Sequence, residues 1–208
     1  MTSARLWLWL VPSACYLVFC VWYTNLAGPL REAEIQTFVA RMQAAGAPVE
    51  RIAFMREFMQ QDTGRQLIMI NALDMNENPR QLPATGPDAS AAELLNHYMA
   101  HMYPALLARA SHPVFAGTAV YDAMDVSGIE GAQTWDQGAL MRYRSRRDLM
   151  EISTHPTFAT RHDYKMAALE KTIAYPVEAS LYYADMRILL ALALFAVTSL
   201  ADLLIYRR

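Results

Sequence analysis

Long apolar runs lie near the two ends of the 208-residue chain, and shorter periodic patterns lie between them. Residues 6–27 and 187–206 are largely apolar, and each run is long enough to cross the hydrocarbon core of a bilayer, about 30 Å, as a helix. Aromatic residues near both ends of the first run are typical of membrane–water interfaces: Trp7, Trp9, Trp22 and Tyr23. The pattern therefore predicts two transmembrane helices in contact with the lipid bilayer.

The first run has two alternatives to a retained anchor, a cleaved signal peptide and a lipoprotein signal. A signal-peptide cut near Ala27 would put Asn25 where a small residue is needed. A lipoprotein site at Cys15 would have Pro12 where leucine or a similar residue is usual. These departures favour a retained anchor.

Basic residues lie at the outer tips of both runs. Arg5 precedes the first run, and Arg207 with Arg208 ends the second. By the positive-inside rule, both termini are expected in the cytoplasm and the residues between the runs on the other side. In a bacterium, the protein would lie in the inner membrane with a periplasmic central domain.

Asp202 interrupts the second run. It is expected either at headgroup depth beside the terminal arginines or against a partner helix, since carboxylates in membranes usually face protein. Small residues could let such a helix approach closely. The residues proposed for contact with a partner in the membrane are Asp202, Ala193, Ala196 and Ser199.

The central patterns predict a helical lead-in over residues 31–63 and an α+β domain over residues 64–180. Strand patterns lie at 67–73, 114–123, 139–143 and 173–177, and helix patterns at 90–106 and 146–171, the second broken at Pro156. The order βαββαβ is that of the ferredoxin-like fold, an antiparallel sheet with helices on one face. The other apolar face is left uncovered, so a second copy or another protein is expected to cover it.

Charge and cysteine content exclude several classes of protein. A net charge of −2 argues against nucleic-acid binding, because few phosphates could be neutralised. Both cysteines, Cys15 and Cys20, lie in the first apolar run, so the central domain has no disulfide and no cysteine metal site. No phosphate-binding glycine loop, dinucleotide fingerprint or Ser/His/Asp set is present, and no cofactor is expected. The arginines at 142, 144, 146 and 147 are interpreted as a solvated face rather than an anion-binding patch.

Two histidines are weak candidates for a metal site. His97 and His101 are four residues apart on an expected helix, a spacing that can bring two imidazoles to one metal. A third ligand would have to come from elsewhere, for example His112, His155 or His162. Because no full metal motif accompanies the pair, packing or surface roles are favoured.

Several short motifs between about Ile52 and Glu178 resemble a known superfamily. They are Leu67 to Asn71, the helix of His97, Tyr98 and Met99 ending near Pro104, Trp135-Asp136, Arg142 to Arg146, and His155-Pro156. On these residues the chain resembles the dimeric α/β-barrel superfamily, which includes antibiotic-biosynthesis-type monooxygenases, and is closest to a largely uncharacterised branch. The resemblance implies the ferredoxin-like fold and a homodimer formed through the sheet face.

The resemblance also suggests catalytic candidates. His155, Arg142, Tyr143 and Trp135 occupy matching positions and could line a pocket between the sheet and its helices, where histidine and tyrosine handle protons and arginine holds a carboxylate or enolate. The alternative, which we favour, is structural: Trp135 and Tyr143 fill the core, and His155 satisfies the helix break at Pro156.

The sequence supports two main hypotheses for the function. The first is an accessory or scaffolding subunit of a larger membrane complex, of a respiratory or photosynthetic type, with other membrane subunits as partners. The alternative is a membrane-anchored, cofactor-independent oxygenase or isomerase that acts on a small apolar substrate. It requires an enclosed pocket containing His155, Arg142 and Tyr143. A third hypothesis, a haem or metal binder, requires an imidazole that projects into a cavity.

Overall fold

The computed structural model describes residues 3–206, so Arg207 and Arg208 lie outside the described residues. The chain divides into two compact units. One is Ala27–Glu178, and the other combines Met1–Leu26 with Ala179–Arg208.

Two helices of 21 residues make up the terminal unit, α1 (Ser3–Tyr23) and α7 (Met186–Tyr206). Both are long and apolar enough to cross a membrane, and only 6% of the apolar window of each is buried. They contact each other through the Trp9 and Phe195 rings, whose centroids are 6.1 Å apart. The first helix ends at Tyr23 rather than at the expected residue 27, because Thr24 and Asn25 are weak helix formers.

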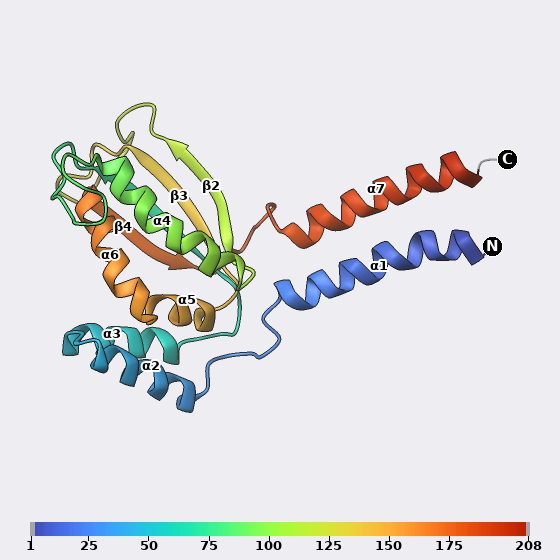
Figure 1. Ribbon diagram of the computed structural model, residues 1–208, viewed down its shortest axis with the longest axis horizontal. Coiled ribbons are helices and arrows are strands. Elements are labelled where there is room, and N and C mark those ends of the chain that lie inside the picture. Colours follow the sequence, from blue (N-terminus) through green and yellow to red (C-terminus); the bar gives the residue numbers. More distant parts are fainter. Residues whose placement is uncertain (1–2, 207–208) are drawn as a thin grey trace. The chain divides into compact units, whose positions relative to one another are not determined.

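The central unit contains one four-stranded sheet, shown in Figure 1. Its strands are β1 (Leu67–Met75), β2 (His112–Thr118), β3 (Gln137–Tyr143) and β4 (Leu169–Val177). They lie in the order β2-β3-β1-β4, and all neighbours are antiparallel. Helix α4 (Ala91–Leu107) joins β1 to β2, and α5 (Arg146–Ser153) with α6 (Pro156–Ala168) joins β3 to β4. The predicted α+β class and ferredoxin-like strand order are therefore confirmed.

Several strand boundaries differ from the prediction, and the largest differences are at the end of β2 and the start of β4. β2 ends at Thr118 rather than at residue 123, because the backbone bonds beyond it, such as Ala123 N–H to the Gln133 carbonyl, do not continue the ladder between β2 and β3. Residues 169–171, expected as helix, begin β4, because Leu169 pairs with Met75 after a register shift between β1 and β4. The helix break is confirmed, since α6 begins at Pro156.

The core lies between the sheet and helices α4 and α6. Leu67 and Tyr143 contribute from the sheet, and the core-facing stripe of α4 is Leu94, Tyr98, Met102 and Leu106. Successive members of this stripe are four residues apart, which keeps their side chains on one face of the helix. A capping box begins α4, with Ser90 and Glu93 bonding reciprocally.

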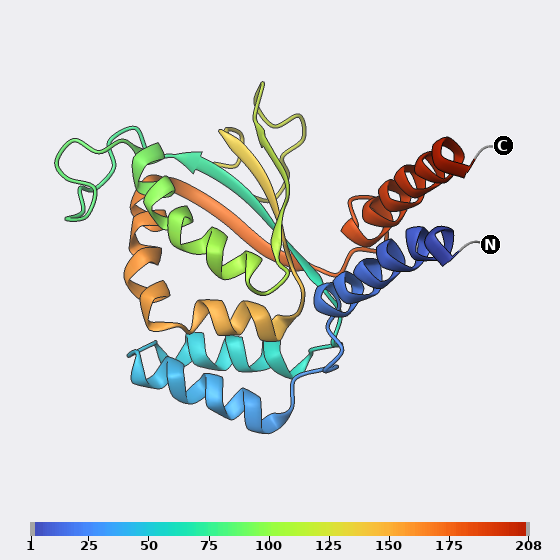
Figure 2. The same ribbon diagram turned by 45° about the vertical axis from the view of Figure 1, so that its right-hand side comes forward.

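The lead-in helices α2 (Glu32–Ala44) and α3 (Val49–Gln60) form a second layer outside α5, as Figures 1 and 2 show. Their buried side chains pack against Met150 of α5 in a second core cluster: Ile35, Phe38, Val39, Met42, Met55 and Met59. Asp62, just after α3, accepts hydrogen bonds from the backbone N–H of Leu30 and Gly64. The lead-in is therefore packed on the domain and extends its helical side.

The arginines near β3 are not a solvated face, so that interpretation is wrong. Arg144 pairs with Asp148 at 2.7 Å, and Arg147 pairs with Glu34 at 2.6 Å. Arg146 donates to the Phe58 carbonyl and lies 3.7 Å from Asp62. Arg146 and Arg147 connect α5 to the lead-in, whereas Arg144 binds within the start of α5, because each guanidinium offers several donors in fixed directions.

Candidate functional site

The four residues suggested by the resemblance do not converge on one site. Arg142 and Tyr143 are neighbours on β3, so their side chains point to opposite faces of the sheet. Arg142 is 1% exposed. Its Nε donates to Gln66 Oε1 at 2.9 Å, and its guanidinium also donates to the Ala110 carbonyl. Arg142 thus ties the end of β3 to the segments before β1 and after α4.

Tyr143 fills the core on the helix side of β3. Burial raises the pKa of its phenol to about 12, so it stays protonated at neutral pH. Trp135 lies before β3, where its indole N–H donates to the Ala132 carbonyl at 2.9 Å. The Lys171 ammonium lies 5.0 Å from the centre of the Trp135 ring. These contacts give both aromatic residues packing roles.

His155 has the position expected for a helix break. It is the N-cap of α6, and its Nδ1 accepts a hydrogen bond from the Thr157 N–H at 3.3 Å. Pro156 then occupies the first turn, where a missing N–H costs nothing. His155 also lines a cavity, described below, and is the only member of the predicted group of four that does so.

The two candidate metal ligands have other partners. His97 Nε2 lies 2.7 Å from an Arg161 nitrogen, so this imidazole nitrogen accepts a hydrogen bond. Burial, and then the charge of Arg161, lower the pKa of His97. The ring centroids of His101 and His155 are 6.2 Å apart, and the two ring planes are tilted by 37°. Within residues 3–206, no group of three or more His, Cys, Asp or Glu side chains is placed to hold a metal ion.

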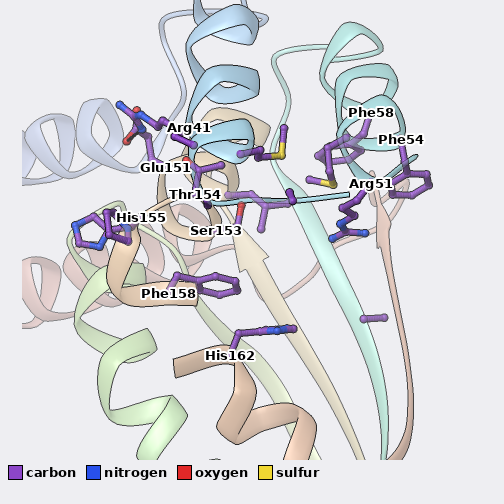
Figure 3. Close-up of a pocket in the computed structure, with 18 of the residues that line it drawn as sticks. Arg41, Arg51, Phe54, Phe58, Glu151, Ser153, Thr154, His155, Phe158 and His162 are labelled. Atoms are coloured by element: carbon purple, nitrogen blue, oxygen red, sulfur yellow. Dashed lines mark hydrogen bonds and ion pairs between the residues drawn. The ribbon is translucent and has the colours of Figure 1, made fainter. Parts of the chain in front are cut away.

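A cavity of about 980 Å³ opens on the helix side of the sheet. It is bounded by α2, α3, α5 and α6, and the sheet contributes Met69, Ala174 and Pro176. Figure 3 shows residues from these elements around one space. Apolar side chains form most of the wall: Met42, Ala44, Ala45, Ala47, Phe54, Met55, Phe58, Leu149, Pro156 and Phe158.

Polar side chains are few and are placed at particular points of this cavity. Arg41 and Glu151 form an ion pair at 2.9 Å on one side, next to Ser153 and Thr154. Arg51 and His162 enter from α3 and α6, and Figure 3 shows both directed toward the space. Burial, followed by the charge of Lys165, lowers the pKa of His162, which is therefore neutral at pH 7. The cavity combines apolar walls with a cationic side.

Sequence reasoning missed this cavity because half of its wall comes from the lead-in. The methionine and phenylalanine stripes of residues 31–63 pack in part as core. The same stripes also face the cavity through Met42, Met55 and Phe58. A usable signal was the pair of arginines, Arg41 and Arg51, on either side of the Gly46-Ala47-Pro48 turn.

Comparison with known proteins supports the fold alone. No family model matches the chain, and no curated protein does. A solved protein of unknown function from Rhodopseudomonas palustris is 17% identical, with a TM-score of 0.51, over 62% of this chain and 94% of that chain. Its methylated form is 18% identical, with a TM-score of 0.52, over 63% of this chain and 92% of that chain.

A third match, from Bacteroides fragilis, is described as a dimeric protein of unknown function with a ferredoxin-like fold. It is 12% identical, with a TM-score of 0.33, over 55% of this chain and 96% of that chain.

Proposed function

We propose that the chain is an accessory subunit of a larger membrane protein complex, anchored by α1 and α7, whose α+β domain contacts a partner protein on the periplasmic side of a bacterial inner membrane. The observation that carries this proposal is an apolar band on the uncovered face of the sheet. The band is one cross-strand row, formed by Phe115, Leu140, Ile70 and Tyr175.

The sheet-face band is unusually exposed for apolar residues of a sheet. Phe115 is 55% exposed and Tyr175 is 48% exposed, while Leu140 and Ile70 between them are half-buried. Ile173, in the next row, is 37% exposed. Contiguous apolar surface of this kind on a folded domain marks a contact site.

Two glycines leave room for the Phe115 ring on this face. Gly117 and Gly138 are paired across β2 and β3, and the Phe115 ring lies over them. A β-carbon on Gly117 would come within 3.0 Å of this ring. An open, apolar face of this kind suits a protein surface that buries it as one layer.

The terminal unit has the features of a membrane anchor. Most of the leucines and valines on its helices are 45–76% exposed, unlike those on the core helices of a soluble domain. Arg5 donates two hydrogen bonds to Asp202, each 2.7 Å long, so both charges are satisfied inside the pair, as charges near a bilayer require. Asp202 therefore faces the chain's own first helix. Ala193 and Ala196 are exposed and remain the proposed contact with another membrane helix.

The oxygenase or isomerase alternative depended on a pocket shared by His155, Arg142 and Tyr143. Only His155 lines the cavity, and Arg142 and Tyr143 are held elsewhere. We therefore do not propose that reaction.

The proposal is tested by purifying the full chain from its native membranes in mild detergent, with native sizing and mass spectrometry of bound proteins. We expect a stoichiometric set of other membrane subunits, and at least a tenfold loss of them in Tyr175→Lys, which puts a charge in the band. Met166→Lys is the matched control, because Met166 is 49% exposed on α6, away from the band. A chain that purifies alone, as a monomer or as a dimer, overturns the proposal.

A further inference from the structure

The cavity beneath the lead-in helices has unbalanced charge. Arg41 is neutralised by Glu151 at 2.9 Å. Arg51 has no carboxylate partner in the described part of the chain, and its guanidinium lies over the Phe54 ring, 5.6 Å from the ring centre. The cavity therefore carries one arginine whose charge is not balanced inside the protein.

A second cation lies near the same side. Lys165 is three residues from His162 on α6 and is half-buried, and among residues 3–206 it has no ion-pair partner. Burial lowers the pKa of the Lys165 amine, which means that its charge is poorly solvated. Arg51 and Lys165 both lower the pKa of His162, whereas Asp163 raises it. The positive potential thus converges on the His162 side of the cavity.

The rest of the cavity is apolar and large. A volume of about 980 Å³ is at the upper end of the range of small-molecule sites, roughly 300–1,000 Å³. Met55, Phe58, Met69 and Phe158 line it from both the helices and the sheet. Such walls gain free energy only from an apolar occupant, because a small polar ion would leave them facing water.

We propose that this cavity binds a single-chain amphiphile with a carboxylate head, with the carboxylate at Arg51 and the apolar chain between the lead-in helices and the sheet. A guanidinium offers two parallel donors that match the two oxygens of a carboxylate. Arg51 and Phe54 are both exposed and lie at the mouth of the cavity, so the head remains near water while the chain is buried. The expected ligand is therefore of the fatty-acid class.

The test uses the full chain in nanodiscs of phosphatidylcholine, with a diazirine analogue of palmitic acid as the probe. After illumination, mass spectrometry locates the crosslinks. We expect crosslinks in the segments that line the cavity, 41–58 and 149–176, and their loss on addition of excess palmitate. Labelling confined to α1 and α7 would show partition into the bilayer only, and would overturn the proposal.

Charge recognition is tested separately. Arg51→Gln is expected to lower cavity labelling about tenfold, the effect of losing one charge-assisted hydrogen-bonded pair. Arg51→Lys keeps the charge and should retain most of the cavity labelling. Arg65→Gln changes an exposed arginine outside the cavity and should leave the labelling unchanged. A second probe, the diazirine analogue of hexadecanol, has no carboxylate. Its labelling of the wild-type cavity should be as weak as the labelling of Arg51→Gln by the acid probe. Equal labelling by acid and alcohol would overturn the carboxylate assignment.

Discussion

The two faces of the sheet are made from the same four strands but have different surroundings. On the helix side, Leu67 is 1% exposed and Tyr143 is 6% exposed. On the other side, Phe115 and Tyr175 are about half exposed in a row of apolar side chains. Both faces carry large apolar side chains, so the presence of such residues in a strand does not tell which face is covered. The difference comes from the helices, including the two that precede the domain.

The most direct way to sharpen this comparison is to truncate one apolar side chain on each face. Leu67→Ala should lower the free energy of unfolding by about 3–5 kcal/mol, because it leaves a cavity in the packed side. Ile173→Ala, at a position 37% exposed on the other face, should cost less than about 1 kcal/mol in the isolated chain. Urea unfolding in mild detergent, followed by circular dichroism, measures both. A large loss in Ile173→Ala would mean that the chain itself covers this face.

A second prediction concerns how the lead-in is fixed to the helix side. Gly64 has a φ of +76°, and a β-carbon there would lie 2.8 Å from backbone atoms of Gly28 and Pro29. Gly64→Ala should therefore destabilise the domain by about 2–4 kcal/mol, through both the strained φ and the overlap.

Gly46→Ala separates these two causes. Gly46 also has a positive φ, +73°, but nothing lies within 4 Å of its added β-carbon. We expect a loss of about 1 kcal/mol there, in the same urea experiment. Equal losses at the two glycines would show that the approach of residues 28 and 29 does not hold the lead-in in place.

The sequence was sufficient to predict the fold because the order of the elements is local information. Capping residues such as Ser90 and Ser145, and the break at Pro156, mark helix starts whatever covers them. Boundaries were predicted less well where tertiary pairing decides them. Leu169 is strand because it meets Met75 on β1, a contact that no local pattern contains.

The candidate site could not be predicted in the same way. The motifs around Arg142 and Tyr143 are next to each other in sequence, but alternation along β3 separates their side chains. The cavity, by contrast, joins residues from 41 to 176 that only the packing of α2 and α3 brings together. Helix periodicity showed that these helices have an apolar face, and it could not show that this face leaves a space.

The smallest predicted effect tests the electrostatic attachment of the covered side. Glu34 on α2 accepts hydrogen bonds from Arg147 on α5 at 2.6 and 3.1 Å. The Arg147 guanidinium, and then the Arg31 backbone N–H, lower the pKa of Glu34 to about 2. Since this carboxylate has a lower pKa when folded, its contribution is complete above about pH 4.5 and is lost as the pH falls toward 2.

Glu34→Gln should therefore lower the free energy of unfolding by about 1–2 kcal/mol at pH 7, a value reduced for solvent screening because the side chain is 35% exposed. The difference in free energy of unfolding between the wild type and Glu34→Gln should become smaller between pH 4.5 and pH 3 in urea titrations. Glu32→Gln, on the same turn but 61% exposed, should change stability by less than about 0.5 kcal/mol. A gap at Glu34 that stays constant down to pH 3 would show that the packing of α2 on α5, and not this ion pair, holds the lead-in over the cavity.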